Sequence, residues 1–377
     1  MHSSPLLGRL TAAGAVVVAT ALVGGCADFS QQDESAHAGA FSSAAEGPQN
    51  PPTEPPDTSQ DEQDPPTGPC VDKNPAVIAT CLGTTSGVRP ASADGKSTYV
   101  AERTTGNIII SKRYGPQRVI ATVPVDGSGD GGLIDFELSP GYQQDQLIYA
   151  LISTGADNRV VRIAPGNSVK PILTGIPKGA TGNMGSISFA SPTELRVATG
   201  DAGDPAAAEN PGSLAGKLLT IDPNVAGGRP RIVASGLGSN VSLCPSPEDG
   251  ALYLADSGAA GDRLLQVEAG GLKKLWSWGA RPGLTGCAVS GGTITVSMAT
   301  KFRLELLRAP TNTDPTVGEP QESDMKKQYG AVGRLTSLGS AVQLATVNKS
   351  VPGAPAASTN DRVAIISPSG ASGDDRM

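Results

Sequence analysis

The side chains of this chain that offer chemistry are carboxylates. Glu102 and Asp256 each lie two residues beyond the centre of a short apolar strand, and Asp201 follows a third strand of the same kind. Three carboxylates at related positions supply the oxygen ligands that calcium prefers. Each also suits a turn, in which it accepts bonds from nearby backbone amides. The spacing therefore predicts a cation site at Glu102, Asp201 and Asp256, with turn formation as the alternative.

Histidine chemistry is missing from most of the chain. The two histidines, His2 and His37, both precede the strand-like part of the sequence. A Ser-His-Asp triad, a His-ligated metal and a His general base are therefore excluded from that part. A carboxylate whose pKa is raised by burial can act as a base instead. Asp130 and Asp201 are the candidates for that role.

Six short strands of one pattern position these residues. Their third residues recur at intervals of 42 to 57 residues, at Val100, Tyr149, Val197, Leu254, Val296 and Leu344. Helical periodicity is nearly absent, and Gly and Pro interrupt the chain about every ten residues. This regular repeat predicts an all-β, six-bladed β-propeller, with the site where loops converge at one mouth of the central channel. A β-sandwich with insertions would not explain the spacing.

The N-terminus predicts a lipid anchor. Arg9 precedes an uncharged run, Leu10 to Gly25, that ends in small residues before Cys26. This pattern is typical of a bacterial lipoprotein signal peptide, and the run is too short to span a bilayer as a helix. We expect residues 1–25 to be removed and Cys26 to carry lipid, which would hold the protein extracytoplasmically at the outer face of the cell membrane.

A disordered tether is predicted after the anchor, at 26–69. It is rich in Pro, Ser, Gln and acidic residues, and it has too little apolar surface to fold. Ten acidic residues lie between Asp28 and Asp72. Residues 73–377 therefore carry 28 basic and 26 acidic side chains. No basic patch suggests nucleic-acid binding. The propeller is expected at 70–370, with a disordered tail at 371–377.

Four cysteines remain besides Cys26. An even number in an oxidising compartment favours two disulfides, and proximity in sequence makes Cys70–Cys81 and Cys244–Cys287 the expected pairs among three arrangements. Trp276 and Trp278 are spaced to face one side of a strand, where core packing is favoured over sugar stacking.

Several segments resemble a known family. Gly131 to Tyr142, Gly185 to Asp201 and Ser213 to Pro223 are similar to segments of the soluble quinoprotein glucose/sorbosone dehydrogenases. Within that family, the whole chain is most similar to a group of actinobacterial lipoproteins. The resemblance implies a six-bladed propeller, pyrroloquinoline quinone (PQQ), calcium and sugar oxidation.

The site residues depart from that family. Its Asp-His pair, in which the His is the general base, corresponds to Thr181-Gly182 here. The resemblance carries over Asn240 and Arg334 as quinone contacts, whereas a second arginine of the family corresponds to Thr336. Because each lost contact to a quinone carboxylate costs about 1.5 to 3 kcal/mol, binding and turnover are expected to be weakened.

Three functions follow as hypotheses. The preferred one is a diverged propeller that binds a glycan, another small molecule or an envelope protein. The first alternative is a PQQ-dependent sugar dehydrogenase with a non-His base. The second is a calcium-dependent lactonase-like hydrolase that uses Glu102, Asn183, Asn240 and Asp256, which requires these four side chains to converge.

Overall fold

The structure is a computed structural model that describes residues 66–368. The predicted signal peptide, Cys26, most of the tether and the tail at 371–377 lie outside the described residues. No helix at 66–368 is long and apolar enough to cross a membrane.

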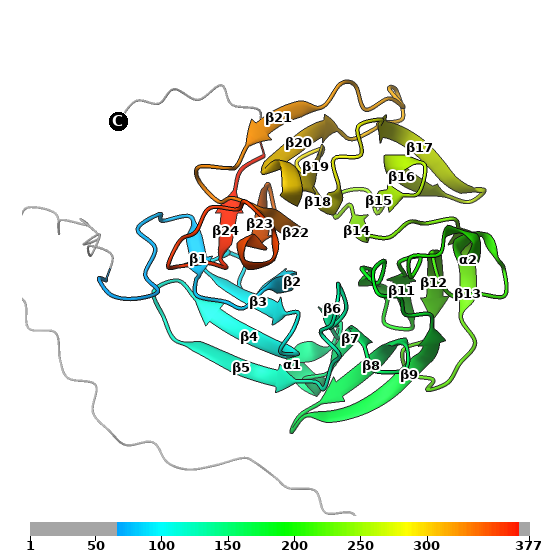
Figure 1. Ribbon diagram of the computed structural model, residues 1–377, viewed down its shortest axis with the longest axis horizontal. Coiled ribbons are helices and arrows are strands. Elements are labelled where there is room, and N and C mark those ends of the chain that lie inside the picture. The colour runs from blue at the N-terminus through cyan, green and yellow to red at the C-terminus, as the bar shows by residue number, and fades with distance from the viewer. Residues whose placement is uncertain (1–65, 369–377) are drawn as a thin grey trace, which may run out of the picture. The chain divides into compact units, whose positions relative to one another are not determined.

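Six antiparallel four-stranded sheets surround a central axis, so the predicted six-bladed propeller is confirmed (Figure 1). Blade one contains β2 (Thr85–Pro90), β3 (Ser97–Glu102), β4 (Asn107–Lys112) and β5 (Gln117–Thr122). Blade two contains β6 (Leu133–Leu138), β7 (Ile148–Ser153), β8 (Asn158–Ala164) and β9 (Ser168–Ile176). Blade three contains β10 (Ser186–Ser191), β11 (Glu194–Ala198), β12 (Lys217–Ile221) and β13 (Arg231–Ser235).

The remaining blades complete the ring. Blade four contains β14 (Val241–Pro245), β15 (Leu252–Gly258), β16 (Gly261–Glu268) and β17 (Gly271–Trp278). Blade five contains β18 (Leu284–Ser290), β19 (Thr293–Met298), β20 (Arg303–Arg308) and β21 (Gln321–Asp324). In blade six, β22 (Val332–Leu338), β23 (Ala341–Thr346) and β24 (Val363–Ile366) are joined by β1 (Val77–Ala79), so the N-terminal strand closes the ring.

Helices are short and lie between strands. They are α1 (Tyr142–Asp145), α2 (Pro205–Glu209) and the 3-10 turns η1 (Ala299–Lys301) and η2 (Asn348–Ser350). The near absence of helical periodicity predicted this arrangement.

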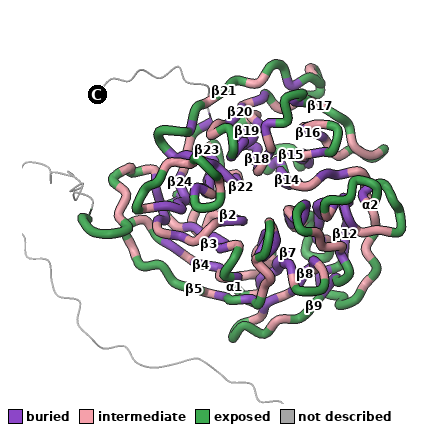
Figure 2. Tube along the Cα trace, in the orientation of Figure 1, coloured by how far each residue is buried: buried purple, intermediate pink, exposed green. Residues whose placement is uncertain are grey.

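The six aligned sequence segments are the second strands of the six blades, β3, β7, β11, β15, β19 and β23. They are largely buried on both faces because each blade packs between two neighbours (Figure 2). The core accordingly forms six clusters, one at each interface between blades. Phe136 and Ile148 lie in the cluster between blades one and two, for example, and Val88 and Val363 in the one between blades six and one.

Both predicted disulfides are confirmed. Cys70 and Cys81 are 5.5 Å apart between Cα atoms, beside the closing strand β1. Cys244 and Cys287 are 5.6 Å apart and link β14 to β18, the innermost strands of blades four and five. The tryptophan prediction also holds, because Trp278 is buried in the cluster between these blades, with Trp276 packed against it.

Candidate functional site at the entry face

The innermost strands β2, β6, β10, β14, β18 and β22 all begin at one face of the propeller, which we call the entry face. Antiparallel pairing brings the ends of the second strands to that face, since Thr85 pairs with Glu102 and Val241 with Asp256. Asp201 lies in the loop that leaves β11, on the same face. The shared strand position thus places the three predicted carboxylates at one end of the channel.

The three carboxylates do not form one metal site. At 66–368, no group of three or more His, Cys, Asp or Glu side chains is placed to hold a metal ion. Glu102 accepts hydrogen bonds from the Gly83 amide at 2.6 Å, from Thr105 and from Asn107. Asp256 is fully buried and accepts from the Gly238 amide at 2.7 Å. Both carboxylates thus accept from backbone amides, but these amides lie 19 and 18 residues away in sequence, so neither bond is the local turn that the alternative predicted.

Asp130 holds the loop at 179–185, which the resemblance aligns with the family's catalytic segment, and Asp201 lies in the neighbouring loop. Asp130 accepts from the Gly182 amide at 2.7 Å and from Asn183 Nδ2 at 2.5 Å. Asp201 accepts from the Gly203 amide at 2.9 Å. Burial raises the pKa of Asp201, and the nearby Asp130 carboxylate adds to the effect. Of the two predicted bases, Asp201 therefore has the raised pKa that a base requires, whereas the carboxylate of Asp130 is occupied by the loop it supports.

Gly182, which the resemblance aligns with the family's histidine, has no room for a side chain. Its φ is +78°, a conformation that costs L-residues free energy. A Cβ atom at this position would lie 2.5 Å from Asp201 Oδ1 and closer still to the backbone nitrogen of Gly203. The missing histidine is therefore a property of the local backbone as well as of the sequence.

Arg334 reaches across the channel from blade six. Its Nη2 donates to the Gly185 carbonyl at 2.7 Å and its Nη1 to the Val241 carbonyl at 3.2 Å, in blades three and four. Burial lowers the pKa of Arg334 to about 10, although the Asp135 carboxylate opposes this shift. Asn240 is the other predicted quinone contact, and its Oδ1 is buried without a hydrogen-bond partner. The guanidinium that was expected to bind a quinone carboxylate thus joins three blades instead.

A second channel arginine was not foreseen from the sequence. Arg89 on β2 donates to Asp135 at 3.2 Å, to Glu137 at 2.9 Å and to the Ile187 carbonyl at 3.2 Å. Although burial opposes it, the two carboxylates raise the pKa of Arg89. The available signal was one arginine in the β2 segment and two acidic residues in the β6 segment, and their positions in sequence do not show that they pair.

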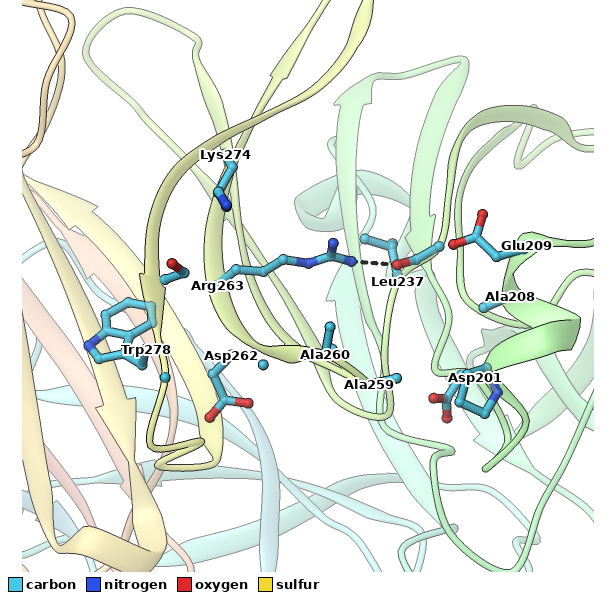
Figure 3. A pocket seen from close by; sticks show the side chains of 16 residues that line it. Asp201, Ala208, Glu209, Leu237, Ala259, Ala260, Asp262, Arg263, Lys274 and Trp278 are labelled. Atoms are coloured by element: carbon cyan, nitrogen blue, oxygen red, sulfur yellow. Dashed lines mark hydrogen bonds between the residues drawn. The ribbon is translucent and has the colours of Figure 1, made fainter.

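A pocket of about 350 Å³ opens on the entry face between blades three and four (Figure 3). One wall carries Asp201 and, from α2, Glu209, and the opposite wall carries Arg263 and Lys274. Small residues of the β15–β16 turn, Gly258 to Gly261, line it as well. Within that turn Ala259 and Ala260 are exposed and apolar, whereas Ala208, Leu237 and Trp278 lie buried behind the pocket surface. The pocket therefore combines opposed charges with a partly apolar lining.

The short helix α2 is fixed at both ends. Asp204 accepts from the amides of Ala206 at 3.0 Å and Ala207 at 3.2 Å, which caps the first turn. The buried Lys217 donates to the carbonyls of Ala207 and Ala208 at the other end. This anchoring holds Glu209 at the rim of the pocket.

Arg263 is the link between the pocket and the buried Asp256. Its Nε donates to Asp256 Oδ2 at 2.7 Å, and Nη2 donates to the Gly236 carbonyl, as the dashed line in Figure 3 shows. Burial raises the pKa of Asp256, and Arg263 counteracts this shift. The basic residue that opens β16 was visible in the sequence, but its pairing across the blade was not predicted.

The residues at the entry face do not fit PQQ. This quinone carries three carboxylates, whereas Asp130 and Asp201 add negative charge here and Arg334 already donates to two carbonyls. Thr336, which the resemblance aligns with the family's second arginine, lines a cavity in the channel. Three members of the lactonase set already have partners, since Glu102 and Asp256 accept from the Gly83 and Gly238 amides and Asn183 donates to Asp130.

Comparisons with known proteins agree with the fold. A sequence-family model described as glucose/sorbosone dehydrogenase matches residues 90–274. The PQQ-bound aldose sugar dehydrogenase of Streptomyces coelicolor is 24% identical with a TM-score of 0.67, and the alignment covers 77% of this chain and 95% of that one. A putative glucose dehydrogenase of Thermus thermophilus is 22% identical with a TM-score of 0.66, covering 77% and 98%.

A third solved structure, the apo aldose sugar dehydrogenase of Escherichia coli, is 16% identical with a TM-score of 0.63 and covers 77% of this chain and 98% of that one. No curated protein matches the sequence significantly. At these identities the structures establish the shared fold, and the family model adds the sequence evidence. Residues 90–274 of this six-bladed propeller therefore match the glucose/sorbosone dehydrogenase family in sequence.

Proposed function

We propose that this protein is an envelope binding protein whose propeller no longer oxidises sugars with a quinone and instead holds a saccharide in the pocket between blades three and four. The observation that carries the proposal is Gly182. Its Cβ would overlap Asp201 and Gly203, so the family's base cannot be accommodated without rebuilding the loop. Arg334 supports the same conclusion, because carbonyls of blades three and four take its Nη donors.

The pocket suits a saccharide because its walls differ in hydrogen-bonding character. Asp201 and Glu209 accept hydrogen bonds, whereas Arg263 and Lys274 donate them. Sugar hydroxyls do both and can bridge the two walls, while the C–H faces of a sugar ring can pack on exposed apolar side chains such as Ala259 and Ala260. The structural relatives named above are sugar dehydrogenases, which supports the same ligand class.

The location belongs to the proposal as well. The lipobox ending at Cys26 and the acidic, Pro-rich stretch up to residue 69 support a lipid-anchored protein on a tether. A tether lets a binding domain reach ligands within the envelope while it stays attached to the membrane. Two disulfides agree with an oxidising compartment.

One observation favours the alternative of a dehydrogenase with a carboxylate base. Asp201 lines the pocket, and burial raises the pKa of its carboxyl, which is the property a general base requires. This alternative predicts that the protein with PQQ and calcium reduces an artificial electron acceptor when sugar is added, and that Asp201→Asn abolishes the activity.

The saccharide proposal can be tested by calorimetry on the full-length protein in detergent. The probes are glucose, galactose, arabinose, trehalose and N-acetylglucosamine, without PQQ. We expect at least one to bind, and we expect Glu209→Gln and Lys274→Gln each to weaken binding about tenfold, the loss of one charge-assisted hydrogen bond.

Lys273→Gln is the matched control, because Lys273 is the adjacent exposed residue of β17 but does not line the pocket. It should bind as tightly as the unmodified protein. Equal affinity in all three variants would place the saccharide elsewhere, and absence of binding by every probe would contradict the proposed ligand class.

A further inference from the structure

The pocket between blades three and four holds opposite charges apart. Asp201 and Glu209 lie on one wall, and Arg263 and Lys274 lie on the other (Figure 3). In the described part of the chain no salt bridge joins the two walls. Arg263 instead pairs with Asp256, which is buried and does not line the pocket. The two walls therefore leave their opposite charges to be bridged by a ligand.

The acidic wall contains an unpartnered carboxylate oxygen. Asp201 is only 4% exposed, and its Oδ1 accepts from the Gly203 amide at 2.9 Å, whereas its Oδ2 has no hydrogen-bond partner within residues 66–368. The side chain of Glu209, at the end of α2, has no partner among those residues either. Burial raises the pKa of Asp201, and the Asp130 carboxylate adds to this shift. Because buried polar groups normally have partners, this wall favours a ligand that supplies hydrogen-bond donors and positive charge.

Lys274 supplies the positive charge of the opposite wall. It is exposed on β17, and its ammonium group makes no hydrogen bond or salt bridge in the described part of the chain. The charge of Arg263 is already balanced by Asp256, which accepts from its Nε at 2.7 Å. Asp262 also lines the pocket, but it accepts from the Gly283 amide at 2.5 Å. An acidic group of a ligand would therefore bind Lys274.

The size of the pocket limits the ligand to a small one. Its volume of about 350 Å³ is at the lower end of the range of about 300 to 1,000 Å³ that is typical of small-molecule sites. One sugar ring suits this space, and a ring carries substituents on opposite edges. An amino group on one edge and an acidic group on the other would reach both walls at once.

We propose that the saccharide of this pocket is a zwitterionic amino sugar, whose ammonium group donates to Asp201 and Glu209 while an acidic substituent, a carboxylate or a phosphate, accepts from Lys274. This inference rests on the proposed saccharide-binding function and adds the charges of the ligand to it. An ammonium group supplies only donors and an ionised acidic group only acceptors, so each matches one wall. An uncharged sugar would leave the charges of both walls unpaired.

The test titrates four related sugars into the full-length protein at neutral pH by calorimetry, without PQQ. Glucosamine 6-phosphate carries both charges, glucosamine only the amine, glucose 6-phosphate only the phosphate, and glucose neither. Glucosamine 6-phosphate should bind most tightly, and loss of either charge should weaken binding about tenfold. Muramic acid, an amino sugar with a carboxylate, shows which of the two acidic groups binds more tightly.

Variants assign each charge of the ligand to its wall. Glu209→Gln should weaken binding of the two amine-bearing sugars about tenfold more than binding of glucose 6-phosphate and glucose. Lys274→Gln should weaken binding of the two phosphate sugars about tenfold more than binding of glucosamine and glucose. Both side chains are exposed, so we expect both variants to fold.

Glu268→Gln is the matched control. Glu268 is an exposed carboxylate of blade four that does not line the pocket. It should bind all four sugars like the unmodified protein, and an effect as large as that of Glu209→Gln would contradict the assignment to the acidic wall.

The outcomes separate this inference from the function on which it rests. Equal affinity for all four sugars would overturn the inference and leave the saccharide site intact. Tight binding that needs only one of the two charges would also overturn it, since a zwitterion requires both. Absence of binding by all four sugars and by muramic acid would contradict the proposed function itself.

Discussion

The loop at 179–185 and the pocket between blades three and four lie on the same face of the propeller. They differ in how much space they leave for an added side chain or a ligand. In the loop, Gly182 packs against Asp201 and Gly203 so closely that a Cβ atom has no space. In the pocket, the small residues of the β15–β16 turn and the anchored helix α2 leave about 350 Å³ open. Asp201 belongs to both regions. The comparison shows that one face of the scaffold can hold a tightly packed loop beside an open pocket.

The largest effect is expected from adding a side chain at Gly182, in the loop at 179–185. Gly182→Ala should destabilise the protein by about 3 kcal/mol or more, because left-handed φ strain of about 1 to 2 kcal/mol adds to overpacking of similar size. Urea unfolding would measure the change.

Gly175→Ala is the control, since Gly175 has the same φ of +78° but nothing within 4 Å of its Cβ position. Its free energy of unfolding should fall by only about 1 kcal/mol, which is the cost of the left-handed φ without overpacking. Equal losses for the two variants would show that the loop around Gly182 has room to adjust, and the argument for a closed site would fail.

A smaller effect is expected from replacing Arg263, in the wall of the pocket between blades three and four. Arg263→Met leaves the fully buried Asp256 without its counter-charge and should destabilise the protein by about 2 to 3 kcal/mol at pH 7.5. Adding Asp256→Asn should recover much of this loss, because the Asn Oδ1 can still accept from the Gly238 amide.

The loss of stability in Arg263→Met should depend on pH, and the sign of this dependence follows from the pKa of Asp256. Burial raises the pKa of Asp256, so the stability contribution of this group is full below its unfolded pKa and is lost as pH rises through the folded pKa. Removing Arg263 raises the folded pKa further, so the penalty of Arg263→Met should shrink as pH falls to about 4. A penalty that is independent of pH would indicate lost packing instead of an unpaired charge.

The fold was predictable because its signal repeats. Each second strand is buried between neighbouring blades, so six apolar segments recur at similar intervals and each implies the same unit. The same alignment placed Glu102 and Asp256 at one face, since equivalent strand positions occupy equivalent places in every blade.

The partners of the site residues were not predictable in this way. Glu102 and Asp256 were expected to share a cation, but each bonds within its own blade or to the loop before it. Arg334 donates to the carbonyls of Val241 and Gly185, which are 93 and 149 positions away in sequence. The close contact of Gly182 with Gly203 depends on how two loops pack. Strand patterns carry no information about such contacts.

The most direct test of the closed quinone site is a titration of the full-length protein with PQQ in the presence of calcium, followed by thermal unfolding and quinone absorbance. The PQQ-binding enzyme of Streptomyces coelicolor serves as the positive control. We predict a melting temperature that stays constant at all PQQ concentrations, because a ligand stabilises a folded protein only if it binds to it. A saturable rise in melting temperature with PQQ would contradict the account and restore the dehydrogenase interpretation.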